Sequence, residues 1–437
     1  MKGKGRLLIA GLTAAVMLGA CGTNNGGTGG NQNQGSVKLT FSWWGNQTRN
    51  ERTNKVLQMY SSEHPEVSFD GQFSEWKDYW NKLATASAGH NMPDIVQMDM
   101  MYYQQYASNG QLLDLTSYIE DGTLKLNDVD KGILESAKIN GKTYAVCNGV
   151  NAPMLAYNKK IVSDAGVTVK DGMTLDEFVS ISKTIKEKTG YRTNIGYYAE
   201  TLPEYFMRAE DKKFFDGNKM GSDDAKDYEK LFQLEEKGIK EGWHIDPSAF
   251  SEVTIGSIDQ DMMIYGSNPD RMSWCTFVYS NQLNALEKAA PEGMEFGVTT
   301  WPSDNVKKSN YLKPSQFFCV SADCKNPKQA VEVINYLTNS IDCNKVLLAE
   351  RGVPISKKVS ETIAPEMDQA NQTAIKYINE VVTPNCSTIS PAAPSGATQV
   401  YDQLKSLEEQ VLYRKISASE AAKSLLDKGN EILESGK

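Results

Sequence analysis

Apolar and polar positions follow two different periods along the first third of the chain. The stretch 37–41 alternates with a period of two, which predicts a β-strand. The stretch 49–63 places Val56, Leu57 and Tyr60 on one face, as an amphipathic helix does. The same order recurs in strands predicted at 67–69 and 93–97, and in helices predicted from Ser74, as the N-cap, and over 101–109. Strands that alternate with helices indicate parallel β-α-β units, and therefore an α/β fold.

The rest of the chain predicts further elements in a less regular order. Strands are expected at 141–146, 155–157, 271–274 and 317–320, and helices from Thr174, over 223–238, from Pro327 and, with two breaks, over 397–434. Glycine and asparagine at 148–151, and polar turns near positions 276 and 325, favour crossings between two lobes. This division assigns 37–150 and 277–325 to lobe 1, and 151–276 and 326–437 to lobe 2.

The N-terminal segment has the pattern of a bacterial export signal. Three basic residues precede an apolar run over 7–17, which is shorter than the roughly 20 residues that span a bilayer. The run Leu18-Gly19-Ala20-Cys21 resembles a lipobox, whose cysteine thiol takes the lipid. A chance cysteine after an ordinary signal peptide is the alternative, which the position and spacing disfavour. We therefore expect a signal peptide over 1–20, lipidation of Cys21 (palmitate), and a flexible polar tether over 21–36.

These features predict an extracytoplasmic protein that is held at the cell membrane by its lipid alone, as in a Gram-positive bacterium. The 437 residues carry a formal net charge of −9, and loss of the signal peptide removes three basic and no acidic residues, which leaves −12. Such an acidic chain argues against nucleic acid and anionic lipid as partners.

Cysteine and histidine usage bears on disulfides and metals. Six cysteines remain beside the lipidated one, and Cys319 and Cys324 are close enough in sequence to form a disulfide. Free buried thiols fit equally well in a chain of this length. With three histidines and no C-x-x-C motif, we expect no metal site and no cofactor.

Short motifs follow one another in a fixed order along nearly all of the chain after the tether. They are Trp43-Trp44-Gly45, Trp76-x-x-Tyr79-Trp80-x-Lys82-Leu83, Pro93-Asp94-Ile95, Gly110-x-Leu112-Leu113-Asp114-Leu115, Gly141-Lys142-x-Tyr144, Leu155-x-Tyr157-Asn158-Lys159, Thr174-Leu175-Asp176-Glu177-Phe178 and Gly352-x-Pro354. Together they resemble the extracellular solute-binding proteins (family 1) of carbohydrate ABC transporters, of the lipoprotein type. The resemblance implies a two-lobed periplasmic-binding-protein-like fold (type II), with hinge strands and a central ligand cleft. It also implies a carbohydrate ligand, ABC transporter permease subunits as partners, and a monomer.

Sugar recognition determines which side chains such a cleft needs. The C–H faces of a sugar stack on aromatic rings, and its hydroxyls pair with Asp, Asn, Glu and Arg. In an open α/β sheet these groups gather at the carboxyl ends of the strands. The ligand-binding candidates are Trp43, Trp44, Asn46, Arg49, Trp76, Asp99, Tyr103, Asn148, Asn151, Trp243, Trp274, Phe277, Glu350, Arg351, Ser395 and Gly396. Trp44 is favoured over Trp43, because alternation sends one of the two rings toward the ligand and the other into the core.

Several candidates also fit a purely structural role. Core packing explains Trp76 at least as well as a place at the cleft edge. Asp99 is positioned to cap its helix, and Arg49 to pair with a surface carboxylate such as Glu51.

The leading functional hypothesis is a substrate-binding lipoprotein of an ABC importer, without catalytic residues. Its several aromatic residues favour an oligosaccharide as the ligand. The alternative is a secreted glycosidase or lyase, but a glycosidase needs two carboxylates about 5–9.5 Å apart and the sequence offers no assignable pair. G-x-S-x-G, H-E-x-x-H and Rossmann glycine motifs are also missing from the sequence. A peptide or metal scavenger is a third class, weakened by the few histidines and the aromatic strand ends.

Overall fold

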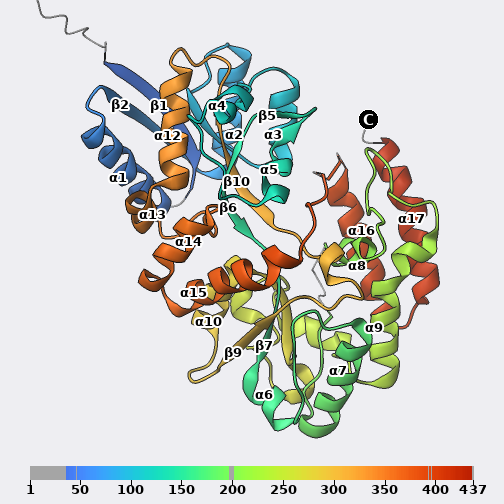
Figure 1. The fold of residues 1–437 in the computed structure, drawn as a ribbon. Coiled ribbons are helices and arrows are strands. Elements are labelled where there is room, and N and C mark those ends of the chain that lie inside the picture. The colour runs from blue at the N-terminus through green and yellow to red at the C-terminus, as the bar shows by residue number, and fades with distance from the viewer. Residues whose placement is uncertain (1–35, 46, 196–200, 392, 395, 436–437) are drawn as a thin grey trace, which may run out of the picture. The chain divides into compact units, whose positions relative to one another are not determined.

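A five-stranded sheet forms the centre of lobe 1 in the computed structural model, which describes residues 36–45, 47–195, 201–391, 393–394 and 396–435 (Figure 1). The strands are β1 (Val37–Trp44), β2 (Val67–Ser74), β3 (Ile95–Met98), β6 (Val146–Asn151) and β10 (Lys313–Val320), in the order β2-β1-β3-β10-β6. β1 is parallel to β2 and to β3, which confirms the predicted β-α-β units. β10 runs antiparallel to β3 and β6, so the sheet is mixed.

Helices surround this sheet, and the longer ones bury one apolar face. They are α1 (Gln47–Glu63), α2 (Trp76–Ala88), α3 (Met100–Ser108), α4 (Thr116–Glu120), α5 (Lys131–Ser136), α12 (Pro327–Asn339), α13 (Ile341–Leu347) and α14 (Lys357–Ile363), with the hairpin β4 (Lys138–Ile139) and β5 (Lys142–Thr143) beside them. α1 buries Val56, Leu57 and Tyr60, as predicted. The predicted cap of the next helix is wrong: Ser74 ends β2, and α2 starts without a side-chain cap.

Lobe 2 is built on a three-stranded antiparallel sheet in the order β8-β7-β9. The strands are β7 (Pro153–Asn158), β8 (Cys275–Tyr279) and β9 (Phe296–Thr299). Its helices are α6 (Lys159–Asp164), α7 (Leu175–Thr189), α8 (Leu202–Arg208), α9 (Glu229–Glu241), α10 (Leu283–Ala289), α11 (Val306–Ser309), α15 (Gln369–Lys376), α16 (Ala397–Leu412) and α17 (Ala418–Ser435). Thr174 and Glu177 form the capping box of α7, which confirms the predicted start of that helix.

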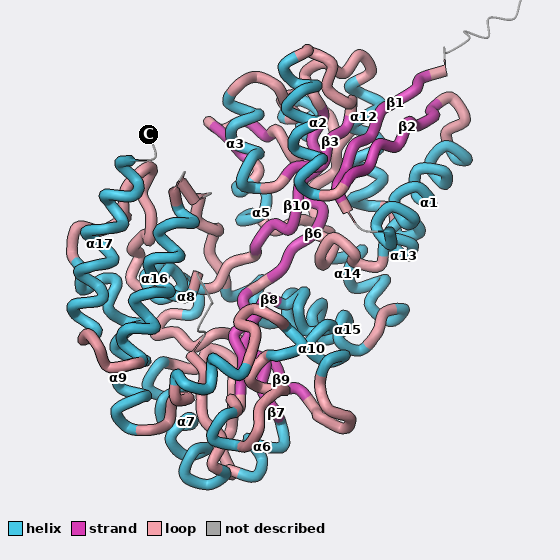
Figure 2. Tube along the Cα trace, turned by 180° about the vertical axis from the view of Figure 1, so that it is seen from behind, coloured by secondary structure: helices cyan, strands magenta, loops and turns pink. Residues whose placement is uncertain are grey.

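The C-terminal helices pack against the middle of the chain. α16 and α17 form an antiparallel pair beside α9 (Figure 2). The helical tail has one interruption, over 413–417, where two had been expected. No helix among the described residues is long and apolar enough to cross a membrane.

The predicted lobe boundaries at 277 and 325 are wrong. β8 and β9 both pair with β7, so the chain stays in lobe 2 beyond residue 277. It returns to lobe 1 at Lys313, where β10 begins, and α12 then packs on β10, β6 and α1. Position 276, where a polar turn was expected, lies inside strand β8, because Thr276 pairs with Ala156 of β7.

Neighbouring segments connect the lobes. β6 passes into β7 through Ala152, and β10 runs beside β6 (Figure 2). The segment after Arg351 lies against β6, because Val353 bridges to Val150. Gly149 makes this approach possible, because a Cβ atom there would lie 2.4 Å from the carbonyl oxygen of Arg351. The chain then passes to lobe 2 between α14, which contacts α13, and α15, which contacts α10.

The open question about cysteines is resolved for the described residues. All six cysteines after position 21 are free thiols, so Cys319 and Cys324 do not form a disulfide. Four of the six are buried, as hydrophobic side chains.

Two carboxyl groups meet in the core between α9 and α16. Glu235 is completely buried and Glu408 nearly so. Burial raises the pKa of Glu235 well above its ordinary value, and the neighbouring Glu408 raises that pKa further. Because the folded state binds a proton that the unfolded state releases, this pair stabilises the fold at acid pH. That contribution is lost as the pH rises through the folded-state pKa.

We therefore expect Glu235→Gln to raise the thermal midpoint by a few degrees at pH 8 and to leave it nearly unchanged at pH 5. The amide keeps the shape of a protonated carboxyl group and cannot ionise. Thermal unfolding of the variant and of Glu409→Gln, an exposed carboxylate on the same helix as Glu408, measures the effect. Equal midpoints for parent and Glu235→Gln at pH 8 contradict this account of the pair.

Candidate functional site

A cleft lies where the two lobes meet and is lined from both. Its volume is about 620 Å³, within the range of ligand-binding pockets. Lobe 1 and the crossing segments contribute Arg49, Asp99, Met100, Asn151, Lys313, Gln316, Glu350 and Arg351, and lobe 2 contributes Tyr279, Ser280, Asn281, Gln282 and Asn371. Most of these side chains donate or accept hydrogen bonds, so the cleft offers polar groups from two sides.

The cleft continues into a second stretch of about 370 Å³ within lobe 2. The two stretches share Tyr279, Gln282 and Lys313. Phe277 and Tyr279 supply aromatic surface here, and the buried ring of Trp301 packs behind them at centroid distances of 5.8 and 5.9 Å. We call the two stretches together the interlobe cleft.

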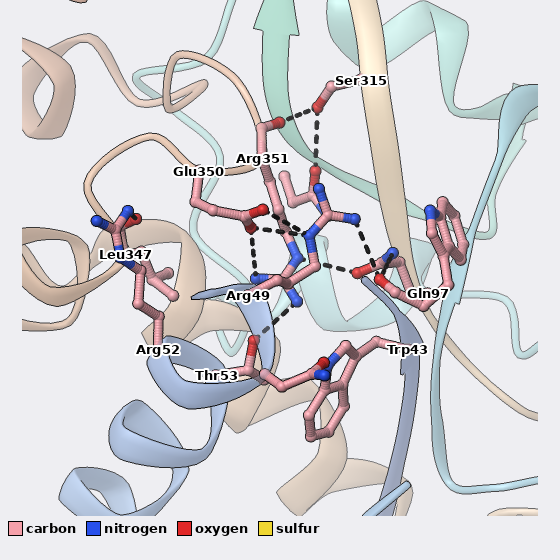
Figure 3. A network of polar contacts seen from close by, with 12 residues as sticks. Trp43, Arg49, Arg52, Thr53, Gln97, Ser315, Leu347, Glu350 and Arg351 are labelled. Atoms are coloured by element: carbon pink, nitrogen blue, oxygen red, sulfur yellow. Dashed lines mark hydrogen bonds and ion pairs between the residues drawn. The ribbon is translucent and has the colours of Figure 1, made fainter. Parts of the chain in front are cut away.

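A network of charged side chains forms the lobe 1 wall of the interlobe cleft (Figure 3). The Nε atom of Arg49 donates to both carboxylate oxygens of Glu350, at 2.9 and 2.8 Å. Arg351 donates from Nε to Gln97 at 2.9 Å and from Nη2 to Thr53 at 2.8 Å. The predicted trio of Arg49, Glu350 and Arg351 therefore comes together across 300 residues of sequence.

The alternative partner proposed for Arg49 is wrong. Glu51 accepts a hydrogen bond from Gln47 at 2.7 Å, whereas Arg49 pairs with Glu350. The Arg49 and Glu350 side chains are only 13% and 11% exposed, so solvent screens this pair weakly.

Arg351 also holds the crossing segments through its main chain. Its carbonyl oxygen accepts a hydrogen bond from the hydroxyl of Ser315, which also faces the carbonyl oxygen of Gly149 at 2.9 Å. Burial lowers the pKa of the Arg351 guanidinium to about 9, and the charge of Arg49 acts in the same direction. At neutral pH the group stays charged, with hydrogen bonds to α1 and to the end of β3.

Asp99 combines the two roles that the sequence left open. It is the N-cap of α3 and accepts from the backbone N–H of Met101 at 2.9 Å. It also lines the interlobe cleft, where burial raises the pKa of its carboxyl group. Across the cleft, the Lys313 ammonium lies 4.5 Å from the centroid of the Tyr279 ring. This cation–π contact joins a crossing strand to lobe 2.

Four predicted ligand residues lie in the hydrophobic cores instead. Trp43 and Tyr103 are buried in lobe 1, and Trp243 and Trp274 are buried in lobe 2. Each directs its polar hydrogen to an acceptor within the same lobe. Burying these large rings stabilises the lobes more than exposing them in the cleft would.

Trp44, the favoured member of its pair, does not line the interlobe cleft either. Its ring is enclosed by Trp76, Tyr79 and Trp80 at centroid distances of 4.9, 5.2 and 5.5 Å. Only its carbonyl oxygen takes part in the wall, where it accepts from Arg49 at 3.1 Å. Trp76 is partly exposed but stands outside the residues that line the interlobe cleft.

The remaining candidates divide into three groups. Asn151 and Phe277 line the interlobe cleft, in its first and second stretch. Asn148 lies behind the first stretch, 3.3 Å from the Ser315 hydroxyl, and Gly396 caps α16 away from the cleft lining. Asn46, Ser395 and the lipidation candidate Cys21 lie outside the described residues.

Lys313, Gln316, Asn371 and the segment 279–282 also line the interlobe cleft but were not predicted from the sequence. Lys313 and Gln316 belong to β10, whose predicted start came four residues too late. Tyr279 ends β8, and residues 280–282 follow it. The strand predicted over 271–274 is wrong, because β8 spans Cys275–Tyr279. Polar residues just after an apolar strand were the available signal in both places. Among the described residues, no group of three or more His, Cys, Asp or Glu side chains is arranged to hold a metal ion.

Comparisons with known proteins agree with this architecture. A family model described as bacterial extracellular solute-binding protein matches residues 56–373. The diacetylchitobiose binding protein DasA of Streptomyces coelicolor is 36% identical over 119 residues, which cover 27% of each chain. A carbohydrate ABC transporter substrate-binding protein of Streptococcus pneumoniae serotype 4 is 22% identical over 308 residues, which cover 66% of this chain and 58% of that one. The matches thus span about a quarter to three fifths of these relatives.

A solved structure shares the fold over nearly the whole chain. The family 1 extracellular solute-binding protein of Alicyclobacillus acidocaldarius superposes with a TM-score of 0.82 at 21% sequence identity. The superposition covers 92% of this chain and 100% of that one, which confirms the two-lobed α/β fold expected from the sequence. Because the family model spans well over half of the sequence, this chain belongs to the family of bacterial extracellular solute-binding proteins.

Proposed function

We propose that this chain is the substrate-binding component of an ABC importer and that it captures a carbohydrate in the interlobe cleft. One observation carries the proposal: hydrogen-bonding side chains line this cleft from both lobes and continue into a stretch with aromatic rings. Sugar hydroxyls need paired donors and acceptors, and sugar C–H faces need flat apolar surface. The relatives named for diacetylchitobiose and for carbohydrate transport support the same class of ligand.

The individual groups in the cleft match sugar chemistry. Asp99 presents a carboxylate acceptor, and Asn151 and Gln282 present amides that both donate and accept. Asp261, in the second stretch, accepts from Thr276 at 2.6 Å. With one stretch of about 620 Å³ and another of about 370 Å³, the cleft favours an oligosaccharide over a single sugar ring.

Capture would couple to movement of the lobes. Asn151 and Lys313 sit on the crossing segments, and Tyr279 sits at the end of a lobe 2 strand. A ligand that bonds to both lobes favours the arrangement in which they are close together. In this proposal the permease subunits recognise that arrangement, and the binding protein acts as a monomer.

The enzyme alternative finds weaker support. A glycosidase needs one carboxylate free to donate a proton and another free to act as base or nucleophile. Glu350 is held by Arg49 through both oxygens, and one oxygen of Asp99 is engaged as a helix cap. We therefore propose binding without chemistry.

The purified chain should bind a carbohydrate and leave it intact. In a thermal-shift screen of plant and host oligosaccharides, the correct ligand at 100 times its Kd adds about 2.7 kcal/mol of stability, which raises the midpoint by several degrees. Chromatography of the recovered ligand should show no product. Release of reducing ends above the blank would favour the glycosidase, and stabilisation by peptides alone would contradict the carbohydrate.

Lys313→Met is the matched test of the site itself. The substitution keeps an apolar stem against the Tyr279 ring and removes the ammonium, so affinity should fall by about tenfold or more in calorimetry. Lys307→Met, on an exposed helix of lobe 2, should bind as the parent does. Equal affinities for all three proteins would place the ligand elsewhere.

We also propose that the mature chain is anchored by a lipid on Cys21, in a Gram-positive bacterium. Cells that express the parent should show the protein in the membrane fraction, with the mass of a diacylglyceryl group on its N-terminal peptide. Cys21→Ala should release it to the medium or block its processing. A membrane-bound Cys21→Ala variant, or an unmodified peptide from the parent, would refute the anchor.

A further inference from the structure

A second hollow lies on lobe 1 between α2 and α3, and its volume is about 460 Å³. α2 contributes Trp80 and Asn81, α3 contributes Tyr102 and Gln105, and Asn109 and Gln111 close it after α3. We call it the α2–α3 groove. None of the described residues that line it also lines the interlobe cleft.

Two aromatic rings that pack on each other form one side of the α2–α3 groove. The rings of Trp80 and Tyr102 stack with their centroids 3.9 Å apart and an interplanar angle of 28°. The indole N–H of Trp80 is buried and finds no acceptor among the described residues. A buried donor without a partner costs stability, and the described part of the fold leaves this one unpaired.

An exposed aromatic ring extends this surface. Trp76 is 41% exposed and lies 5.4 Å from Trp80 and 6.2 Å from Tyr102, centroid to centroid. Met101, the next residue before Tyr102, is 69% exposed. Large apolar side chains that gather on a surface mark a binding site more often than isolated ones do.

The polar side of the groove is rich in amides and carries no charge. The side chains of Asn81, Gln105 and Asn109 make no hydrogen bond within the described part of the chain, and they face solvent. None of the ten described lining residues is charged, although 23% of the sequence is charged and about two would be expected in ten. Amides pair equally well with donors and acceptors, as sugar hydroxyls require, whereas an ion would need an opposite charge.

We propose that the α2–α3 groove binds a ring of a neutral saccharide, as a site separate from the interlobe cleft. This proposal depends on the proposed function in one respect, which is that both sites bind carbohydrate. Met100, at the start of α3, lines the interlobe cleft, and the groove lies along the same nine-residue helix. Such a helix is about 13 Å long, so a glycan held in the groove keeps its chain near the cleft entrance.

Native electrophoresis in gels that contain a neutral polysaccharide tests the groove. The probes are arabinan, galactomannan, mixed-linkage β-glucan, laminarin and pullulan. The groove variant Gln105→Ala/Asn109→Ala is compared with Gln104→Ala/Ser108→Ala, which alters the same helix at the same spacing but outside the groove lining. Trp76→Ala removes the exposed ring, which packs edge-on against Trp80, and leaves both residues of the stacked pair in place. Calorimetry with neutral disaccharides and trisaccharides reports the interlobe cleft separately.

At least one polysaccharide should retard the parent and the Gln104→Ala/Ser108→Ala control equally. Retardation of the groove variant and of Trp76→Ala should weaken by about fivefold or more, while their affinity for short oligosaccharides stays that of the parent. Unchanged retardation of the groove variant, or no retardation of the parent in any gel, overturns the groove alone when short oligosaccharides still bind. If no saccharide binds in either assay, both the groove proposal and the proposed function are contradicted. Sedimentation of the parent and of the groove variant reports their association state. If the groove substitutions change that state and leave retardation unchanged, the groove is a protein interface, and the proposal is overturned.

Discussion

The buried guanidinium of Arg351 holds together segments that are far apart in the sequence. Its side chain donates to Thr53 on α1 and to Gln97 at the end of β3, and its main chain accepts from Ser315 on β10. A buried charge destabilises a protein unless hydrogen bonds and a counter-charge surround it. Here Glu350, shared with Arg49, supplies the counter-charge. The position of the crossing segments relative to lobe 1 depends on these contacts.

The same contacts give the cleft two unlike walls. The lobe 1 wall consists of side chains that are already hydrogen-bonded to one another, so a ligand meets a fixed surface there. The lobe 2 wall consists of Tyr279 and the short turn after it, joined to the crossing strand by the Lys313 contact. A preorganised wall lowers the entropy cost of binding, and a wall on the other lobe allows the site to close on its ligand.

Local sequence patterns were sufficient for the elements but not for their long-range pairing. The apolar stripe of α1 and the capping box of α7 are local, and both were predicted correctly. The membership of β8 and β9 in lobe 2 depends on pairing with β7 more than 100 residues away, which no local pattern reports. That pairing moved the second crossing from residue 277 to Lys313.

Local sequence patterns likewise predicted only part of the candidate site. Arg49, Asp99, Asn151, Glu350 and Arg351 were predicted because each follows a strand or precedes a turn, where cleft residues belong. The roles of the tryptophans were harder to predict, because an aromatic ring at the end of a strand can pack in the core or contact a ligand. Trp43, Trp243 and Trp274 lie in the hydrophobic cores of the lobes.

Denaturant unfolding of Arg351→Lys tests most directly whether this guanidinium organises the cleft. Lysine keeps the charge but loses the planar fork that reaches Thr53 and Gln97 together. The free energy of unfolding should fall by about 2 kcal/mol or more, as expected for lost hydrogen bonds of a buried charged group. Arg52→Lys, whose parent residue makes a single bond to the carbonyl oxygen of Leu347, should change it much less. Equal unfolding free energies for Arg351→Lys and the parent would contradict the account.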